Sequence, residues 1–167
     1  LYRRTLLRIR AEHDITRGKA AIVKGYLLRN TKHRKDYAYI KEASTMALNE
    51  TSNYTPYVLG RLFSTLEAVQ SAANPGINTT IKDKYFNSAA AMPASIFPVL
   101  NNLYQKHLRK LETGQRVYFD KQVSALKGVL SESYPTRMTL AQQGAFDLGY
   151  YHQTQKRYTK KEENENV

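Results

Sequence analysis

The sequence has no cysteine and no tryptophan, and it has only eight glycines and five prolines. Without cysteine it has no disulfide framework, no thiolate zinc ligand and no thiol nucleophile. The longest weakly polar stretch, residues 88–100, is broken by Pro93 and Pro98 and is too short to span a bilayer. The glycines are dispersed and no Gly-Lys-Ser/Thr triplet forms a phosphate loop. We therefore expect no membrane partner, no metal and no cofactor.

Residues that usually carry catalysis are also scarce. The four histidines are His13, His33, His107 and His152, and no two of them stand four residues apart as a metal-binding pair on one helix would. His13 and His107 fall on apolar faces of predicted helices, where a structural role is expected. Asp83 stands between two lysines and Asp147 is isolated, so neither has a local partner for two-acid hydrolysis. The sequence predicts that the protein is not an enzyme.

The chain has an excess of positive charge, and this excess is unevenly distributed. The 167 residues include 26 Lys and Arg against 14 Asp and Glu, for a net charge of +12. Residues 1–41 hold twelve basic and three acidic residues, a net +9, which leaves +3 for the remainder. Such a local excess is typical of polyanion sites, because each cation near a phosphate releases condensed counterions. A solvated basic surface is the alternative interpretation.

Apolar residues recur at helical spacing through most of the chain, and no segment shows the alternation of a strand. Helices are predicted over residues 2–13 and about 14–30, either as one continuous helix or with a break near Asp14, and over 37–48, 55–73, 80–91, 95–112, 115–131 and from 139 onward. The prediction is an all-α, compact bundle of about six or seven helices. We expect a single domain over residues 1–161, with a strongly basic part at 1–41, and a flexible acidic tail at 162–167.

Particular residues mark the predicted helix ends and faces. Thr55-Pro56 predicts a cap followed by the first helical residue, and Asn74-Pro75-Gly76 predicts the end of that helix. Gly114 is predicted to stop the helix before it. The predicted apolar faces are Leu59, Leu62, Phe63, Leu66 and Val69; Ile96, Leu100, Leu103, His107 and Leu111; Phe119, Val123, Leu126 and Leu130; and Leu140, Leu148 and Tyr151.

Several segments in a fixed order carry a family resemblance. These are Leu6–Asp14, Tyr57–Phe63, Asn74–Phe86, Pro93–Pro98 and Gln143–Gln153. In this order they resemble the C-terminal region of the large subunit of the type I-C CRISPR Cascade complex. That subunit is much longer, and the part expected to recognise the adjacent motif has no counterpart here. The same region is similar to a separate small subunit translated from an internal start, and a chain of 167 residues fits that product better.

The resemblance implies a non-catalytic, cytoplasmic, prokaryotic small subunit that lines the belly of the complex in antiviral defence. Its partners would be the backbone and large subunits, neighbouring copies of itself, and the guide RNA–DNA complex, chiefly the displaced non-target strand. In such complexes base pairing reads the sequence, while protein holds the strands by shape and charge. On this interpretation the expected phosphate contacts are Arg3, Arg10, Arg17, Lys24 and Arg29, followed by Lys82 and Lys84.

The spacing of the first candidates suits this task. Arg3, Arg10, Arg17 and Lys24 recur every seven residues, so a continuous helix would align them in one stripe, and a break near Asp14 would leave two pairs. Long cationic side chains along such a ridge can follow a phosphate backbone without reading bases. Lys82 and Lys84 could equally face a neighbouring subunit.

Two other functions remain open at this point. The chain could be the C-terminal domain of the large subunit, acting mainly as a structural adaptor, or a free-standing nucleic-acid-binding helical regulator. The motifs Asn74-Pro75-Gly76 and Gly149-Tyr150-Tyr151 are expected to fix helix packing rather than bind a ligand.

Overall fold

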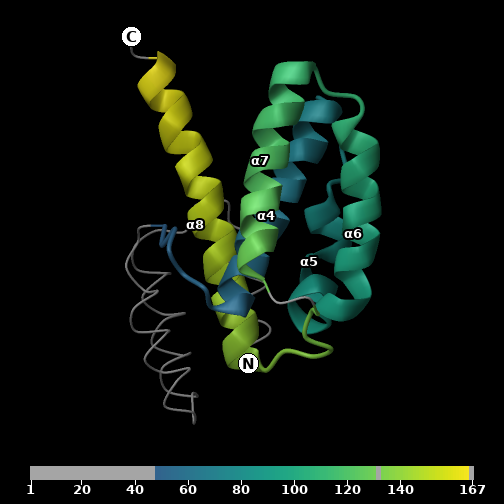
Figure 1. The fold of residues 1–167 in the computed structure, drawn as a ribbon, viewed down its shortest axis with the longest axis vertical. Helices are drawn as coiled ribbons and strands as arrows, with labels where there is room; N and C mark the ends of the chain where they lie inside the picture. Colours follow the sequence, from purple (N-terminus) through teal and green to yellow (C-terminus); the bar gives the residue numbers. More distant parts are fainter. Residues whose placement is uncertain (1–47, 131–132, 166–167) are drawn as a thin grey trace. The chain divides into compact units, whose positions relative to one another are not determined.

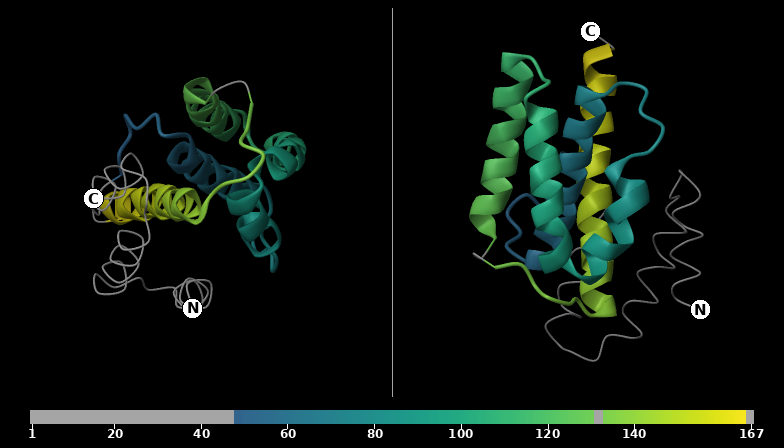
Figure 2. Two further views of the ribbon diagram at one scale, coloured as in Figure 1. Left: turned by 90° about the horizontal axis from the view of Figure 1, so that it is seen from below. Right: turned by 90° about the vertical axis from the view of Figure 1, so that its right-hand side faces the viewer.

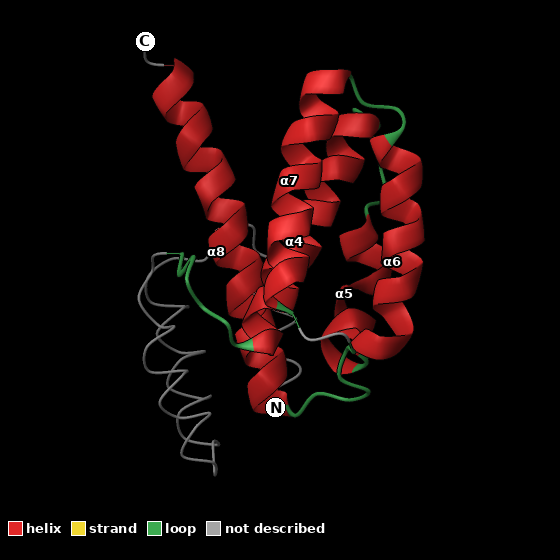
Figure 3. Ribbon diagram, in the orientation of Figure 1, coloured by secondary structure: helices red, strands yellow, loops and turns green. Residues whose placement is uncertain are grey.

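The computed structural model describes residues 48–130 and 133–165, with side chains as far as Arg157. Numbered as in Figure 1, its helices are α4 (Thr55–Ala73), α5 (Ile81–Ala91), α6 (Pro93–Leu108), α7 (Thr113–Val129) and α8 (Leu140–Glu165). These residues contain five helices and no strand (Figure 3), which confirms the all-α class. The count is below the six or seven predicted for the whole chain, and the helices predicted before residue 48 lie outside the described residues. No helix in the described ranges is long and apolar enough to cross a membrane.

Helix α4 lies at the centre of the bundle and packs against the other four described helices (Figure 2). A helix in this position must be apolar nearly all round, and Tyr57, Val58 and Leu59, three residues in succession, are fully buried. The core residues predicted for this helix are confirmed as buried: Leu59, Leu62, Phe63, Leu66 and Val69. The predicted core of α7 is confirmed at Val123 and Leu126, while Phe119 and Leu130 pack at its edge.

Local chemistry accounts for the end of α4 and the start of α5. Helix α4 ends at Ala73, and Gly76 follows in the left-handed region at φ 77°, which glycine adopts without steric cost. Thr80 caps α5 through a reciprocal box: its hydroxyl accepts from the Lys82 amide, and the Asp83 carboxylate accepts from the Thr80 amide at 2.8 Å. Asp83, one of the few isolated carboxylates, therefore has a structural role.

Two predicted ends are corrected. Thr55 is not the cap of α4, because Tyr54 holds the N-cap position, where its side chain makes no capping bond to the helix, and Thr55 is the first helical residue. Gly114 does not stop α6. The chain already turns after Leu108, through bonds from the Lys110 amide to the His107 carbonyl and from the Leu111 amide to the Leu108 carbonyl, and Gly114 lies in the first turn of α7.

Two predicted helix faces are also corrected. On α6 the buried stripe is Phe97, Leu100, Tyr104 and Leu108, because the aromatic rings take the central positions. Ile96 and Leu103 pack at its edge. Helix α6 begins at Pro93, which places Pro98 beyond its first turn. On α8, Leu140 is 59% exposed, because Ala145, Phe146 and Tyr150 supply the buried surface instead.

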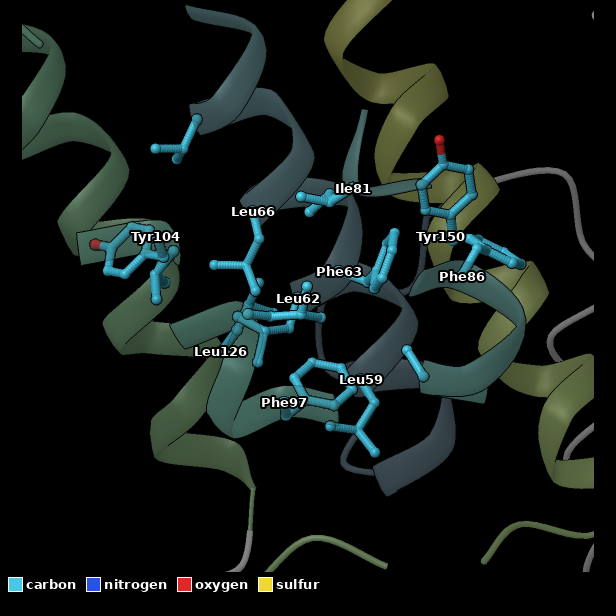
Figure 4. Close-up of a cluster of buried hydrophobic side chains, with 14 of the residues drawn as sticks. Leu59, Leu62, Phe63, Leu66, Ile81, Phe86, Phe97, Tyr104, Leu126 and Tyr150 are labelled. Carbon is cyan, nitrogen blue, oxygen red and sulfur yellow. The ribbon is translucent and has the colours of Figure 1, made fainter. Parts of the chain in front are cut away.

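Aromatic rings from three helices form part of the core (Figure 4). Phe63 of α4 lies 5.4 Å from Phe86 of α5 and 5.8 Å from Phe146 of α8, in edge-to-face geometry. Phe86 also contacts Tyr150 of α8, with ring centroids 4.9 Å apart. This arrangement aligns the negative face of one ring with the positive edge of the next. It ties α4, α5 and α8 into one unit.

Candidate nucleic-acid interface

The predicted phosphate contacts divide between two parts of the chain. Five of them lie outside the described residues: Arg3, Arg10, Arg17, Lys24 and Arg29. Lys82 and Lys84 lie in the first turns of α5. Nothing in the described structure tests these assignments against a nucleic acid, so they remain predictions.

The structure does not bring Lys82 and Lys84 together. Residues two apart on a helix point to different sides. Lys82 turns toward α8, where its ammonium lies 5.0 Å from the centroid of Tyr150 and 5.6 Å from that of Tyr151, an arrangement that favours a cation over a ring. Lys84 is exposed. Among the described residues, Lys82 has a contact that would have to be exchanged for a phosphate, whereas Lys84 is exposed and has none.

A buried polar seam joins α4 to α8. The Ser64 hydroxyl lies 2.8 Å from the Thr154 hydroxyl, and the Arg157 guanidinium donates to Ser64 at 3.1 Å. One turn further along the same face of α4, the Tyr150 hydroxyl donates to the Glu67 carboxylate at 2.6 Å. Burial first, and then the charge of Glu67, raise the pKa of Tyr150, so its phenol stays protonated as the donor. The seam fixes the register of the two helices.

The same seam holds the loop that precedes α4. Arg61 is only 9% exposed, and its guanidinium donates to the backbone carbonyls of Asn49 and Glu50 at 3.2 and 3.1 Å and to the Gln153 side chain at 3.2 Å. Lys156 of α8 pairs with Glu50. The sequence analysis did not predict this role for Arg61. A single arginine within the apolar run Leu59–Phe63 was the available signal.

Two glycines allow α4 and α8 to touch along their backbones. A Cβ on Gly60 would lie 1.9 Å from the Phe146 carbonyl oxygen, and one on Gly149 would lie 2.1 Å from the Tyr57 carbonyl oxygen. The segments Tyr57–Phe63 and Gln143–Gln153, both prominent in the sequence, therefore meet each other in the fold. The packing role expected for Gly149-Tyr150-Tyr151 agrees with this contact and with the burial of Tyr150.

The comparison with protein families decides what kind of protein this is. The model of the family described as CRISPR-associated protein (Cas_Csd1) matches residues 1–158. The chain belongs to this family. It is a type I-C CRISPR protein, as the resemblance of its motifs predicted. No curated protein gives a significant match to it.

In this Cas_Csd1 family member, the motifs that suggested the family build the scaffold. Tyr57 and Gly60 of α4 contact Gly149 and Phe146 of α8, and Asn74 accepts a 2.8 Å bond from the Lys110 ammonium of the α6–α7 link. Asn74 also bonds the His107 ring at 3.1 Å, the structural role expected for that histidine. Among the described residues, no group of three or more His, Asp or Glu side chains could hold a metal ion.

Acidification from pH 7 to pH 5 is expected to destabilise this CRISPR protein through His152. The Tyr57 hydroxyl accepts the Asn49 amide at 3.1 Å, so its own proton is directed to His152 Nδ1, 2.9 Å away, and the imidazole must be neutral. Burial lowers the pKa of His152. Below its unfolded pKa of about 6.5, only the unfolded chain takes up the proton, which lowers the free energy of unfolding by at most about 1.4 kcal/mol per pH unit.

Urea titrations at pH 7, 6 and 5 measure this effect. His152→Gln should be less stable than the unmodified protein at pH 7 but should lose less stability on acidification. His107→Gln is the matched control: burial first, and then Lys110, lower the pKa of His107, but this ring is only half-buried, so its removal should flatten the profile less. Parallel profiles for His152→Gln and the unmodified protein would contradict the prediction.

Proposed function

We propose that this chain is the non-catalytic small subunit of a type I-C RNA-guided surveillance complex. In this role it contacts the backbone and large subunits and holds the displaced non-target DNA strand, which stabilises the open R-loop. The family match supports the setting, since it covers residues 1–158. The observation that carries the proposed role is the charge of +9 concentrated in residues 1–41.

Both parts of the chain suit this task. A sequence-tolerant strand holder needs cations that follow the phosphate backbone, and it needs no base-specific contacts. It also needs a rigid support, because flexible cations lose entropy on binding. The described bundle is itself rigid, because its helices share one core and α8 is locked to α4 by the Gly60 and Gly149 contacts.

The test is the reversal of Arg3, Arg10, Arg17 and Lys24 to Glu in the reconstituted complex. Chemical footprinting of the displaced strand should show new reactive bases, and the R-loop should dissociate faster, with assembly unchanged. Each phosphate contact to a single strand contributes about 0.7 to the slope of log affinity against log salt. Loss of four contacts should therefore make that slope shallower by about 3.

A matched control distinguishes an effect of the proposed site from an effect of the net charge of the protein. The pair Arg3→Glu with Arg10→Glu is measured beside the fourfold reversal, and its control is Lys121→Glu with Arg137→Glu, which changes the charge by the same amount at two exposed residues. The control pair should leave the footprint unaltered. An unaltered footprint for the fourfold reversal, with assembly intact, would mean that the chain acts as an adaptor. Tight, sequence-dependent binding by the chain alone would instead identify a free-standing regulator.

A further inference from the structure

A second cationic surface lies where α6 is followed by α7, on residues different from those of the proposed N-terminal strand site. Its members are Lys106, Arg109, Lys110 and Arg116, here called the α6–α7 corner, and all four are exposed. The first three stand at i, i+3 and i+4, the spacing that places side chains on one side of a helix or its final turn. Figure 1 shows the link between α6 and α7 at one end of the bundle.

Arg116 is brought to this corner by a hydrogen bond to the backbone of the α6–α7 link. Its guanidinium donates to the Leu111 carbonyl at 3.1 Å, which directs the side chain from the first turn of α7 back onto the link. Lys110 donates to Asn74 at 2.8 Å, so the end of α4 also supports the corner. Leu108 and Leu111, which flank the exposed cations, are buried. The backbone that presents the charges is therefore fixed by the core.

Carboxylates in the described part of the chain neutralise the charge of the α6–α7 corner only in part. In the described part of the chain, none of its four members forms an ion pair with a carboxylate. Lys106 and Arg109 have no side-chain bond there, and the acidic residue within the corner, Glu112, is exposed. Four cations against one carboxylate leave a local charge of +3. Fixed cations without acidic partners attract an anion that can reach several of them at once.

We infer that the α6–α7 corner binds the phosphodiester backbone of a nucleic-acid strand. Arginine presents a planar fork of donors that matches phosphate oxygens, and lysine adds point charges. A polynucleotide supplies a phosphate at every step, so one strand can engage Lys106, Arg109 and Arg116 together. The corner offers four exposed cations, which favours a strand held by its phosphates.

The inference rests on the proposed function in one respect only, the identity of the strand that occupies the corner in the complex. Binding of a free strand by the full chain tests the corner itself. The probes are fluorescent 30-mers of single-stranded DNA and RNA with mixed sequence, measured by anisotropy over a range of salt concentrations. Lys106→Glu with Arg109→Glu is the informative variant, because both side chains are exposed and neither has a side-chain bond to another described residue.

This variant should bind about tenfold more weakly at low salt, and its salt slope should fall by about 1.4, which corresponds to two contacts. The charge-conserving variant, Lys106→Arg with Arg109→Lys, should keep the slope. Lys121→Glu with Arg137→Glu is the control of equal charge and should bind nearly as the unmodified chain does. A selective loss with DNA or with RNA supports the site and identifies the strand.

Other outcomes would overturn the inference. Unchanged binding by Lys106→Glu with Arg109→Glu would show that the corner is not a binding site. An equal loss of affinity in the charge-matched control would show that binding depends on the net charge of the protein and not on the corner. An equal loss of binding to labelled polyglutamate would identify a general anion surface. Because Arg3→Glu with Arg10→Glu is measured beside these variants, failure of the corner and failure of the proposed N-terminal site are seen separately.

Discussion

Gly60→Ala and Gly149→Ala are each expected to lower the free energy of unfolding by about 3 kcal/mol. Each new methyl group would meet a backbone carbonyl oxygen of the facing helix, at 1.9 Å for Gly60 and 2.1 Å for Gly149. A flexible side chain could move aside, but a carbonyl within a helix cannot. Helices α4 and α8 would have to separate, which strains the seam at Tyr57 and the ring contacts of Phe146.

The sign of the effect makes this prediction specific. Glycine inside a helix is normally less stable than alanine by about 1 kcal/mol. Gly128→Ala in α7 is the matched control, because a Cβ there meets nothing within 4 Å. It should raise stability by about 0.5–1 kcal/mol. Urea unfolding followed by circular dichroism measures all three variants, and a stabilising Gly60→Ala would show that α4 and α8 do not touch there.

Features with local causes could be predicted from the sequence. The end of α4 at Asn74-Pro75-Gly76 and the start of α5 at Thr80 depend on residues within one or two turns. The buried apolar residues of α4 could also be recognised from their helical spacing. The start of α8 behaves in the same way: the Thr139 hydroxyl and the Gln142 side chain cap each other's backbone amides. In each case the residues that decide the structure are adjacent in the sequence.

Features with nonlocal causes could not be predicted. Glycine commonly ends helices, which favoured Gly114 as a stop, but the chain turns before it because Leu111 packs into the core. The spacing of Lys106, Arg109 and Lys110 was visible in the sequence, whereas the return of Arg116 onto the link depends on where α6 ends. The close approach at Gly60 depends on a helix that follows about eighty residues later. Spacing along one helix carries no information about its neighbour.

The candidate site shows the same division. The resemblance nominated Lys82 and Lys84 together, and the fold separates them. Lys82 lies over two rings of α8, a contact that depends on how α5 packs, and Lys84 is exposed. The net charge of residues 1–41, in contrast, needs no fold to be read from the sequence, and it remains the strongest indication of a polyanion partner.

Phe63→Ala is expected to lower the free energy of unfolding by about 3–5 kcal/mol. Phe63 is fully buried and its ring contacts Phe86, Phe146 and Tyr150, so truncation leaves a cavity bordered by three rings that cannot collapse together. For a protein of this size the midpoint of thermal unfolding should fall by about 10 °C. Tyr118→Ala is the control, since this ring is 53% exposed, and its effect should stay within about 0.5 kcal/mol.

Phe63→Ala also distinguishes the contribution of the aromatic core to strand binding from that of the basic side chains. Below its lowered midpoint the variant retains every cation of the protein, so the salt slope of strand binding should equal that of the unmodified chain. The reversals at Arg3 and Arg10, or at Lys106 and Arg109, should show the opposite pattern: a changed slope with an unaltered midpoint. A reduced slope in folded Phe63→Ala would mean that the aromatic core sets the position of the cations, and the proposed strand contacts would then depend on the packing of α4, α5 and α8.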